Sequence, residues 1–224
     1  MKPIKPITIT IDWPAGSGKG TTARLLAKKL WFLDIDTGAM YRSIGVFLLE
    51  KWADLDAVSE QDMENIIIEF RPDYSIYLNG EEYTTRIRTP EAGQNASRVG
   101  TQAIVRNCVN DTIRKMLQGG NYVLEWRDMG RIFSDFAQVK IFLTADPAIR
   151  AHRRWLELQK KWDMTSEEEI LNQIKERDHR DMTREISPLS KSPDAYEIDT
   201  THLTIEEQVE KIYEIIQDEL RSRK

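Results

Sequence analysis

The sequence is poor in the residues that form disulfides or bind transition metals, with one cysteine and three histidines among 224 residues. Cys108 has no second cysteine with which to form an internal disulfide, which is compatible with a reducing compartment. No apolar run approaches the ~20 residues that a membrane span needs. The first residues, MKPIKPITIT, lack the apolar region of a signal peptide. We therefore expect a cytoplasmic protein with no membrane partner.

Positive charge is not in excess either. The chain has 32 Lys and Arg against 37 Asp and Glu, a net charge of −5. Proteins that bind nucleic acid usually carry a basic surplus, so we expect no nucleic-acid partner. The hydrophobic share of 40% argues against disorder, and the length suits one α/β domain with small lobes. Glycine is scarce, because 11 residues make about 4.9% of the chain against a usual ~7%.

Short apolar runs alternate with longer helical segments, which is typical of βαβ units around a parallel sheet. The expected strands are Ile7–Asp12, Phe32–Asp36, Tyr122–Trp126, Val139–Ala145 and Ala195–Asp199. The expected helices cover 19–30, 38–52, 59–69, 90–117, 147–162, 166–183 and 204–222. Between residues 69 and 88 apolar and polar residues alternate around Asn79-Gly80, which predicts a small antiparallel insertion. The pattern as a whole predicts an α/β fold with a parallel five-stranded sheet flanked by helices.

The most specific motif is ITITIDWPAGSGKGTT, in which a strand leads through a glycine-rich turn into a helix at Lys19. In a P-loop, backbone N–H groups and the helix N-terminus bind phosphate oxygens, and the lysine contacts the β- and γ-phosphates. A glycine-rich turn without a ligand is the alternative. If the motif is a P-loop, the expected ATP-binding residues are Trp13, Pro14, Ala15, Gly16, Ser17, Gly18, Lys19, Gly20 and Thr21, with Lys19 also catalytic.

The loop departs from the usual pattern G-x-x-x-x-G-K-[ST] at two positions. Trp13 stands where the first glycine is expected, and Gly20 stands where Ser or Thr is expected. The ending GKGT is similar to that of nucleoside-monophosphate kinases. The indole at Trp13 fits no version of the pattern.

Beyond this loop, the chain resembles the bacterial cytidylate (CMP) kinase family of P-loop nucleoside-monophosphate kinases over nearly its whole length. The shared strings are DTGAMYR (36–42), IRTPE (87–91), RDMG (127–130), VKIFLTA (139–145), AHRRWLELQ (151–159) and IKERDHRDMTRE (174–185). The resemblance implies a three-layer P-loop kinase fold with a monophosphate-binding lobe and a lid. It also implies transfer of the γ-phosphoryl group of ATP, used with Mg²⁺, to CMP and to dCMP.

The resemblance assigns boundaries to the three parts of a single kinase domain. The core would comprise roughly 1–36, 100–148 and 185–224, the monophosphate-binding lobe roughly 37–99, and the lid roughly 149–184. We expect the protein to act as a monomer with small nucleotides as its partners.

Phosphoryl transfer brings two polyanions together, so the site needs several fixed cations. The resemblance implies catalytic roles for Arg127, Arg153 and Arg177, and ATP binding by Arg154. It implies acceptor binding by Thr37, Arg42, Arg106, Arg127, Asp128, Asp181 and Arg184. For Arg177, Asp181 and Arg184, whose spacing places them on one helix face, a solvent-exposed salt-bridge array is the alternative. We expect no metal site built from side chains alone.

Two other functions stay open from the sequence. One keeps the fold but changes the acceptor to UMP, AMP or a shikimate-like metabolite. The other is an inactive nucleotide-binding relative disabled at Trp13 and Trp126. The insertion at 69–88 and Asp128 favour cytosine, because a carboxylate accepts a hydrogen bond from its exocyclic amine.

The six tryptophans form an unusual set. Trp13, Trp31, Trp52, Trp126 and Trp162 occupy positions where the resembled family commonly carries glycine, whereas Trp155 falls where a large side chain is usual. Left-handed glycine is favoured directly after a helix, as at Trp31 and Trp162. One hypothesis is that the source reads UGA codons as glycine. Deliberate engineering and five natural replacements are the alternatives.

Overall fold

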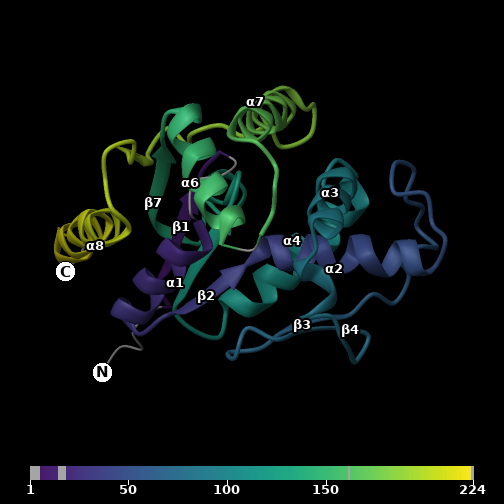
Figure 1. Ribbon diagram of the computed structural model, residues 1–224. Coiled ribbons are helices and arrows are strands. Elements are labelled where there is room, and N and C mark those ends of the chain that lie inside the picture. Colours follow the sequence, from purple (N-terminus) through teal and green to yellow (C-terminus); the bar gives the residue numbers. More distant parts are fainter. Residues whose placement is uncertain (1–5, 15–18, 161, 223–224) are drawn as a thin grey trace. The chain divides into compact units, whose positions relative to one another are not determined.

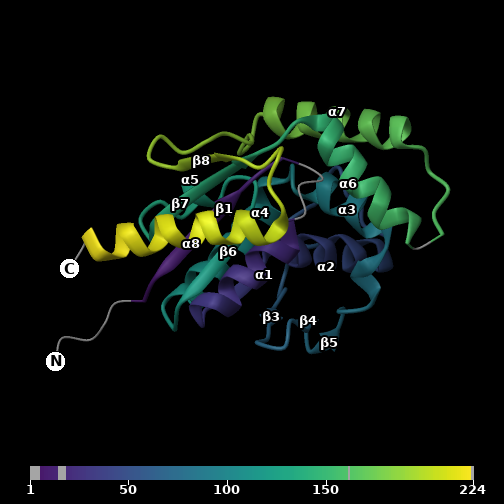
Figure 2. The same ribbon diagram turned by 60° about the vertical axis from the view of Figure 1, so that its left-hand side comes forward.

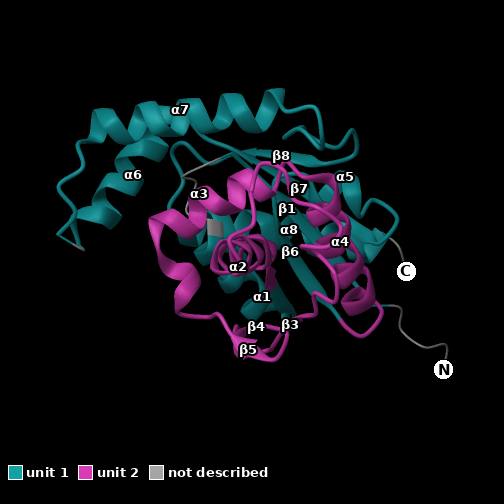
Figure 3. Cartoon of the chain, turned by 90° about the vertical axis from the view of Figure 1, so that its right-hand side faces the viewer, with its two compact units in different colours: residues 1–34, 121–224 teal, residues 35–120 magenta. Residues whose placement is uncertain are grey.

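The computed structural model describes residues 6–14, 19–160 and 162–222, and for Lys19 its backbone alone. The chain forms two compact units, coloured separately in Figure 3: unit 1 comprises Met1–Asp34 and Asn121–Lys224, and unit 2 comprises Ile35–Gly120. Within the described residues, no helix is long and apolar enough to cross a membrane.

Strands and helices alternate through much of the chain (Figures 1 and 2). The strands are β1 (Thr8–Asp12), β2 (Leu33–Asp36), β3 (Ile68–Phe70), β4 (Ile76–Leu78), β5 (Glu81–Glu82), β6 (Tyr122–Trp126), β7 (Ala137–Thr144) and β8 (Tyr196–Asp199). The helices are α1 (Lys19–Leu30), α2 (Thr37–Glu50), α3 (Pro90–Val99), α4 (Ala103–Leu117), α5 (Met129–Ile132), α6 (Pro147–Gln159), α7 (Glu167–Thr183) and α8 (Ile205–Ser222), and Arg86–Arg88 forms a 3-10 turn.

The larger sheet has five strands in the order β2-β6-β1-β7-β8. β1 pairs in parallel with both β6 and β7, and β7 pairs in parallel with β8. All five residues of β1 are buried, as expected for a central strand whose two faces are covered. The predicted parallel five-stranded sheet flanked by helices is confirmed. In open parallel sheets, ligands bind at the carboxyl ends of the strands, at the point where the strand order reverses. In this sheet β1 is the central strand, with β6 on one side and β7 on the other.

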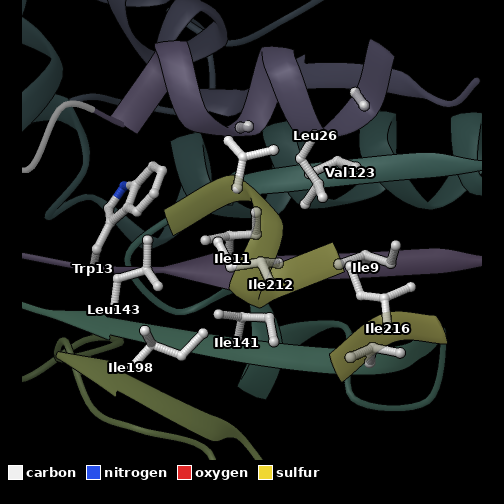
Figure 4. Packing of buried hydrophobic residues seen from close by; sticks show 14 residues of the cluster. Ile9, Ile11, Trp13, Leu26, Val123, Ile141, Leu143, Ile198, Ile212 and Ile216 are labelled. Atoms are coloured by element: carbon white, nitrogen blue, oxygen red, sulfur yellow. The ribbon is translucent and has the colours of Figure 1, made fainter. Parts of the chain in front are cut away.

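Unit 1 buries a cluster of aliphatic side chains from the sheet, α1 and α8, including Ile9, Ile11 and Leu26. Figure 4 shows Trp13 at one end of this cluster and Ile9 at the other. The Trp13 side chain is fully buried, and in the part of the chain that the structure describes its indole N–H has no hydrogen-bond partner. An apolar core thus encloses one unsatisfied donor directly before the glycine-rich loop.

Unit 2 contains the antiparallel sheet β3-β4-β5. Leu78 pairs with Glu81 across the two-residue turn Asn79-Gly80, whose φ angles are 51° and 80°. Two consecutive positive φ angles define the tight turn that matches strand twist, which Asn-Gly favours. The antiparallel insertion predicted for residues 69–88 is confirmed.

Two predicted helices were wrong. The helix expected at 59–69 is a series of turns followed by β3. Ser59 and Asp62 exchange the reciprocal hydrogen bonds of a helix start, but Asn65 adopts a left-handed φ angle of 59°, which ends the turns before a helix can extend. The helix expected at 90–117 is two helices, because the chain turns at residues 100–102 between α3 and α4. The short helix α5 was not predicted.

Candidate functional site

Arg127 directly follows β6 and lies at the carboxyl edge of the sheet. Its side chain is 1% exposed, donates from Nε to Asp181 Oδ2 at 2.8 Å, and donates from Nη1 to the Trp13 carbonyl at 2.9 Å. Its other terminal nitrogen, Nη2, is buried and has no hydrogen-bond partner among the described residues. A buried guanidinium that is fixed on two sides and unsatisfied on the third can accept an anion.

Asp181, near the end of α7, gathers three arginines. Besides Arg127, Arg177 Nε lies 3.9 Å from Asp181 Oδ2, and Arg184 Nη1 lies 3.8 Å from Oδ1. Burial favours a higher pKa for the Asp181 carboxyl, but Arg127, Arg177 and Arg184 outweigh it and hold that pKa below its usual value. One carboxylate therefore fixes a group of three cations, and the group keeps net positive charge.

Arg184 is further held by its own turn. Its Nε donates to the Ser187 carbonyl at 2.7 Å, and its side chain is 10% exposed. The backbone N–H of Leu189 also donates to the Asp181 carbonyl. The segment after α7 thus folds back onto Asp181 and holds Arg184 beside it.

The turn after Arg127 is held by Asp12, at the end of β1. Its two carboxylate oxygens accept from the backbone N–H groups of Met129 and Gly130, both at 2.7 Å. A Cβ on Gly130 would lie 3.1 Å from Asp12 Oδ2, so this close approach favours glycine. Burial raises the pKa of Asp12 to about 7, although the two N–H donors favour the carboxylate. Asp12 thereby positions the turn that carries Arg127 and Asp128, and Asp128 itself is fully buried.

The phosphate loop is only partly visible. Ala15, Gly16, Ser17, Gly18 and the Lys19 side chain lie outside the described residues. Trp13 and Pro14 are buried, Gly20 and Thr21 lie in the first turn of α1, and the Thr21 side chain is exposed. The neighbouring Thr22 hydroxyl instead accepts from Gln208 Nε2 at 3.0 Å inside the core. Of the two threonines, Thr21 is the one whose hydroxyl is accessible to a ligand.

The arginines of α6 have different environments. Arg153 donates from Nη2 to three backbone carbonyls, those of Thr200, Thr201 and Leu203. Arg154 is exposed and pairs with Glu157 at 2.9 Å. Arg150 is buried and pairs with Asp178 of α7 at 2.7 Å. Arg153 and Arg150 thus fix α6, whereas Arg154 is free to turn toward a ligand.

Unit 2 contains the other predicted residues. Asp36 caps α2 by accepting from Ala39 N, and it also accepts from Arg42 Nη2 at 2.7 Å. Thr37, the first residue of α2, is fully buried. Arg106 is buried on α4, donates to the Gly100 carbonyl, and lies 5.8 Å from the centre of the Tyr41 ring. Asp36 thus positions the Arg42 side chain beside the first turn of α2.

Two positioning residues were missed by the sequence prediction, Asp12 and Asp178. Each is a buried acid whose partners lie far away in sequence, at 129–130 and at 150. An acidic residue at the end of an apolar strand, directly before the glycine-rich loop, was the available signal for Asp12. Nothing in the string around Asp178 distinguishes it from a solvent-exposed helix residue.

Comparisons with known proteins agree with this arrangement. A family model described as cytidylate kinase matches residues 9–218. A cytidylate kinase of Fervidobacterium nodosum is 45% identical over 215 residues, which cover 95% of this chain and 97% of the relative. One from Thermotoga maritima is 37% identical over 217 residues, 96% of this chain and 98% of the relative. A crystal structure of a Thermus thermophilus protein aligns with a TM-score of 0.54 at 18% identity over 97% of this chain and 99% of that one, a likeness of fold alone.

Proposed function

Because the chain belongs to the cytidylate kinase family, we propose that it transfers the γ-phosphoryl group of ATP to CMP, and to dCMP, releasing ADP and the diphosphate. The observation that carries the proposal is the buried Arg127, fixed by Asp181 and the Trp13 carbonyl and unsatisfied at Nη2. An acceptor phosphate satisfies that nitrogen and completes the charge balance of the arginine group.

Acceptor binding is assigned to Arg127, Asp128, Asp181 and Arg184 of unit 1, and by the resemblance to Thr37, Arg42 and Arg106 of unit 2. Arg184 and Arg127 neutralise the acceptor phosphate, while Asp181 holds both guanidinium groups in place. Asp128 accepts from the exocyclic amine of cytosine. The oxygen of uracil at that position has no proton to donate and is repelled by the carboxylate.

The donor side is assigned to the phosphate loop and to the arginines of α6 and α7. Lys19, with the loop residues Trp13 to Thr21, binds the ATP phosphates, and Arg154 adds a further contact. Arg153 and Arg177 neutralise charge on the transferring group, which passes directly from donor to acceptor oxygen. No general base is required, because the attacking phosphate oxygen is already anionic.

Mg²⁺ enters with ATP and neutralises charge on its phosphates. The donor set fits this ion: Thr21 presents an exposed hydroxyl, and a carboxylate oxygen of Glu125 lies 3.8 Å from the place a Cβ on Gly20 would take. Hydroxyl, carboxylate and water oxygens are the ligands that Mg²⁺ prefers. Thr21 and Glu125 would hold the ion or its water.

The remaining expectations belong to the same proposal. The division into a core, a monophosphate-binding lobe near 37–99 and a lid near 149–184 stays a prediction. So do a cytoplasmic location, action as a monomer, and nucleotides as sole partners without nucleic acid.

Product analysis tests the proposal. The purified chain is incubated with ATP, Mg²⁺ and CMP, and the nucleotides are separated by chromatography. We expect one CDP for each ADP formed, and none from an Arg127→Met variant that still binds ATP. If the chain binds ATP but forms no diphosphate from CMP, it is a nucleotide-binding relative rather than a kinase, and the proposal fails.

A further inference from the structure

Three of the six tryptophans share one backbone conformation. Trp31, Trp52 and Trp162 each have a φ angle of 60°, in the left-handed region. For a bulky L-residue this region is a genuine outlier, because Cβ comes too close to the following carbonyl. The side chains are 94%, 95% and 88% exposed. They therefore gain almost no burial energy that would offset the strain.

The hydrogen bonds around the three positions are also the same. The residue after each tryptophan donates to the carbonyl four residues before the tryptophan: Phe32 to Ala27, Ala53 to Leu48 and Asp163 to Leu158. Each tryptophan donates to the carbonyl three residues before it: Trp31 to Lys28, Trp52 to Leu49 and Trp162 to Gln159. This pair of bonds is the Schellman motif that ends a helix, and its left-handed position is most often glycine.

Glycine itself is nearly missing from such positions in the described part of the chain. There, seven residues other than glycine have positive φ, and three of these are tryptophans, while Gly80 is the one glycine with positive φ. Two of the other four are asparagines, Asn65 and Asn79, which tolerate this region. At the left-handed helix ends where glycine is usual, this chain has tryptophan instead.

Trp155 provides an internal contrast. It lies inside α6, stacks on His152 with ring centres 5.8 Å apart, and packs against the buried cluster of Ala151, Ile170 and Ile174. Its environment is one that a large aromatic side chain suits. The tryptophans of this chain are therefore of two kinds: Trp155 suits its position, whereas those at the three left-handed helix ends do not.

We infer that positions 31, 52 and 162 are glycine in the protein as its native cell makes it, and that the codon translated here as tryptophan at these positions is decoded there as glycine. The inference stands on backbone conformation and is independent of the proposed function. Exposed indoles that dock a partner are the rival explanation, but docking does not require the same left-handed helix end three times. A shared decoding does produce one residue type at three such positions.

The gene and the native protein test the inference directly. The codons at 31, 52 and 162 should be UGA, and the codon at 155 should be UGG. In tryptic peptides of the native protein, those containing positions 31, 52 and 162 should have the masses calculated with glycine, and the peptide containing 155 the mass calculated with tryptophan. UGG codons at the three positions, or tryptophan in the native peptides, would overturn the inference.

Thermal unfolding of recombinant protein tests its physical basis. Trp31→Gly, Trp52→Gly and Trp162→Gly should each raise Tm by about 2–4 °C, because the strain is relieved. The matched variants Trp31→Ala, Trp52→Ala and Trp162→Ala remove the same indoles but keep a Cβ, so their Tm should rise by less than that of the glycine variants. Trp155→Gly should lower Tm. Equal gains with alanine and glycine, or no gain with glycine, would contradict the backbone argument.

Discussion

At the scale of single residues, the site depends on how one carboxylate is shared. Asp181 is surrounded by Arg127, Arg177 and Arg184, yet it forms a short hydrogen bond only with Arg127. The guanidinium groups of Arg177 and Arg184 lie farther from this carboxylate, at 3.9 and 3.8 Å. A buried charge network of this kind is costly unless it is completed, so its completion by a phosphate favours ligand binding.

Arg127→Lys tests this geometry. A lysine ammonium cannot reproduce two hydrogen bonds from a planar fork together with a third toward the ligand. We expect kcat/KM for CMP to fall by roughly 10- to 100-fold, the value of a lost hydrogen bond to a charged group. Arg114→Lys, which changes an exposed pair with Asp111, is the matched control and should leave the steady-state constants unchanged. Equal constants for Arg127→Lys and the unchanged chain would refute the role of the fork.

Asp12 gives a pH dependence of stability with a definite sign. Its pKa is raised from 3.8 to about 7 on folding, so between about pH 4 and 7 the folded state keeps a proton that the unfolded state loses. The free energy of unfolding contributed by Asp12 therefore falls as pH rises through that window. An asparagine at position 12 cannot ionise. The free energy of unfolding of Asp12→Asn, relative to that of the unchanged chain, should therefore increase by roughly a few kcal/mol from pH 4 to pH 8.

Urea unfolding at several pH values measures this difference. Asp56→Asn serves as a control of opposite sign, because Arg98 lowers the pKa of the exposed Asp56. Its stability relative to the unchanged chain should worsen as pH rises from the lowered pKa to 3.8 and stay constant from pH 4 to pH 8. A difference between Asp12→Asn and the unchanged chain that stays constant from pH 4 to pH 8 would contradict the raised pKa of Asp12.

Residue types at the site were predictable, but their contacts were not. The string RDMG singled out Arg127 and Asp128, since a charged pair directly after an apolar strand lies at the ligand edge of a parallel sheet. That Arg127 donates to the Trp13 carbonyl depends on β1 and β6 being neighbours, which joins residues 114 positions apart. Local pattern carries no signal for such a pairing.

At the scale of elements, helix packing in unit 2 depends on one glycine. A Cβ on Gly45 of α2 would lie 3.0 Å from Asn95 Cβ and 3.2 Å from the Asn95 backbone carbon in α3. The two helices therefore approach closely only because that side chain is absent. Gly93 of α3 has nothing within 4 Å of its Cβ position.

Two alanine substitutions should act in opposite directions. Gly45→Ala forces α2 and α3 apart and should lower the free energy of unfolding by about 1–3 kcal/mol. Gly93→Ala meets no obstacle and should raise it by roughly 0.5–1 kcal/mol through helix propensity. Urea unfolding of both variants is the measurement. Destabilisation by both, or by neither, would show that the close approach of α2 and α3 does not determine the effect.

Strands were easier to predict than helix boundaries. Three strands of the parallel sheet, β1, β6 and β7, consist mainly of apolar or β-branched residues, a pattern that needs no tertiary information. The break between α3 and α4 lies at Gly100, where a Cβ would come 2.8 Å from the Ala96 carbonyl. From the sequence alone, a single glycine is compatible either with a break between two helices or with one long helix that tolerates it.

At the scale of the whole molecule, charge composition and local charge disagree. The chain has a net charge of −5, yet Arg127, Arg177 and Arg184 gather around one aspartate in unit 1. The absence of a basic surplus predicts that the protein has no nucleic-acid partner, which stays a prediction, and composition gave no sign of a local anion site. That site came from order along the chain, where each cationic string follows a strand or lies on one helix face.

The choice of acceptor tests the account most directly. Initial rates of ADP release are measured with ATP and Mg²⁺ and with CMP, dCMP, UMP or AMP offered separately, for the chain as printed and for a Trp13→Gly/Trp126→Gly variant. From the proposed hydrogen bond between the cytosine amine and Asp128, we predict kcat/KM for CMP at least about tenfold above those for UMP and AMP, and turnover of dCMP as well. A higher kcat/KM for UMP or AMP, or no ADP release from any acceptor with both proteins, would contradict the account.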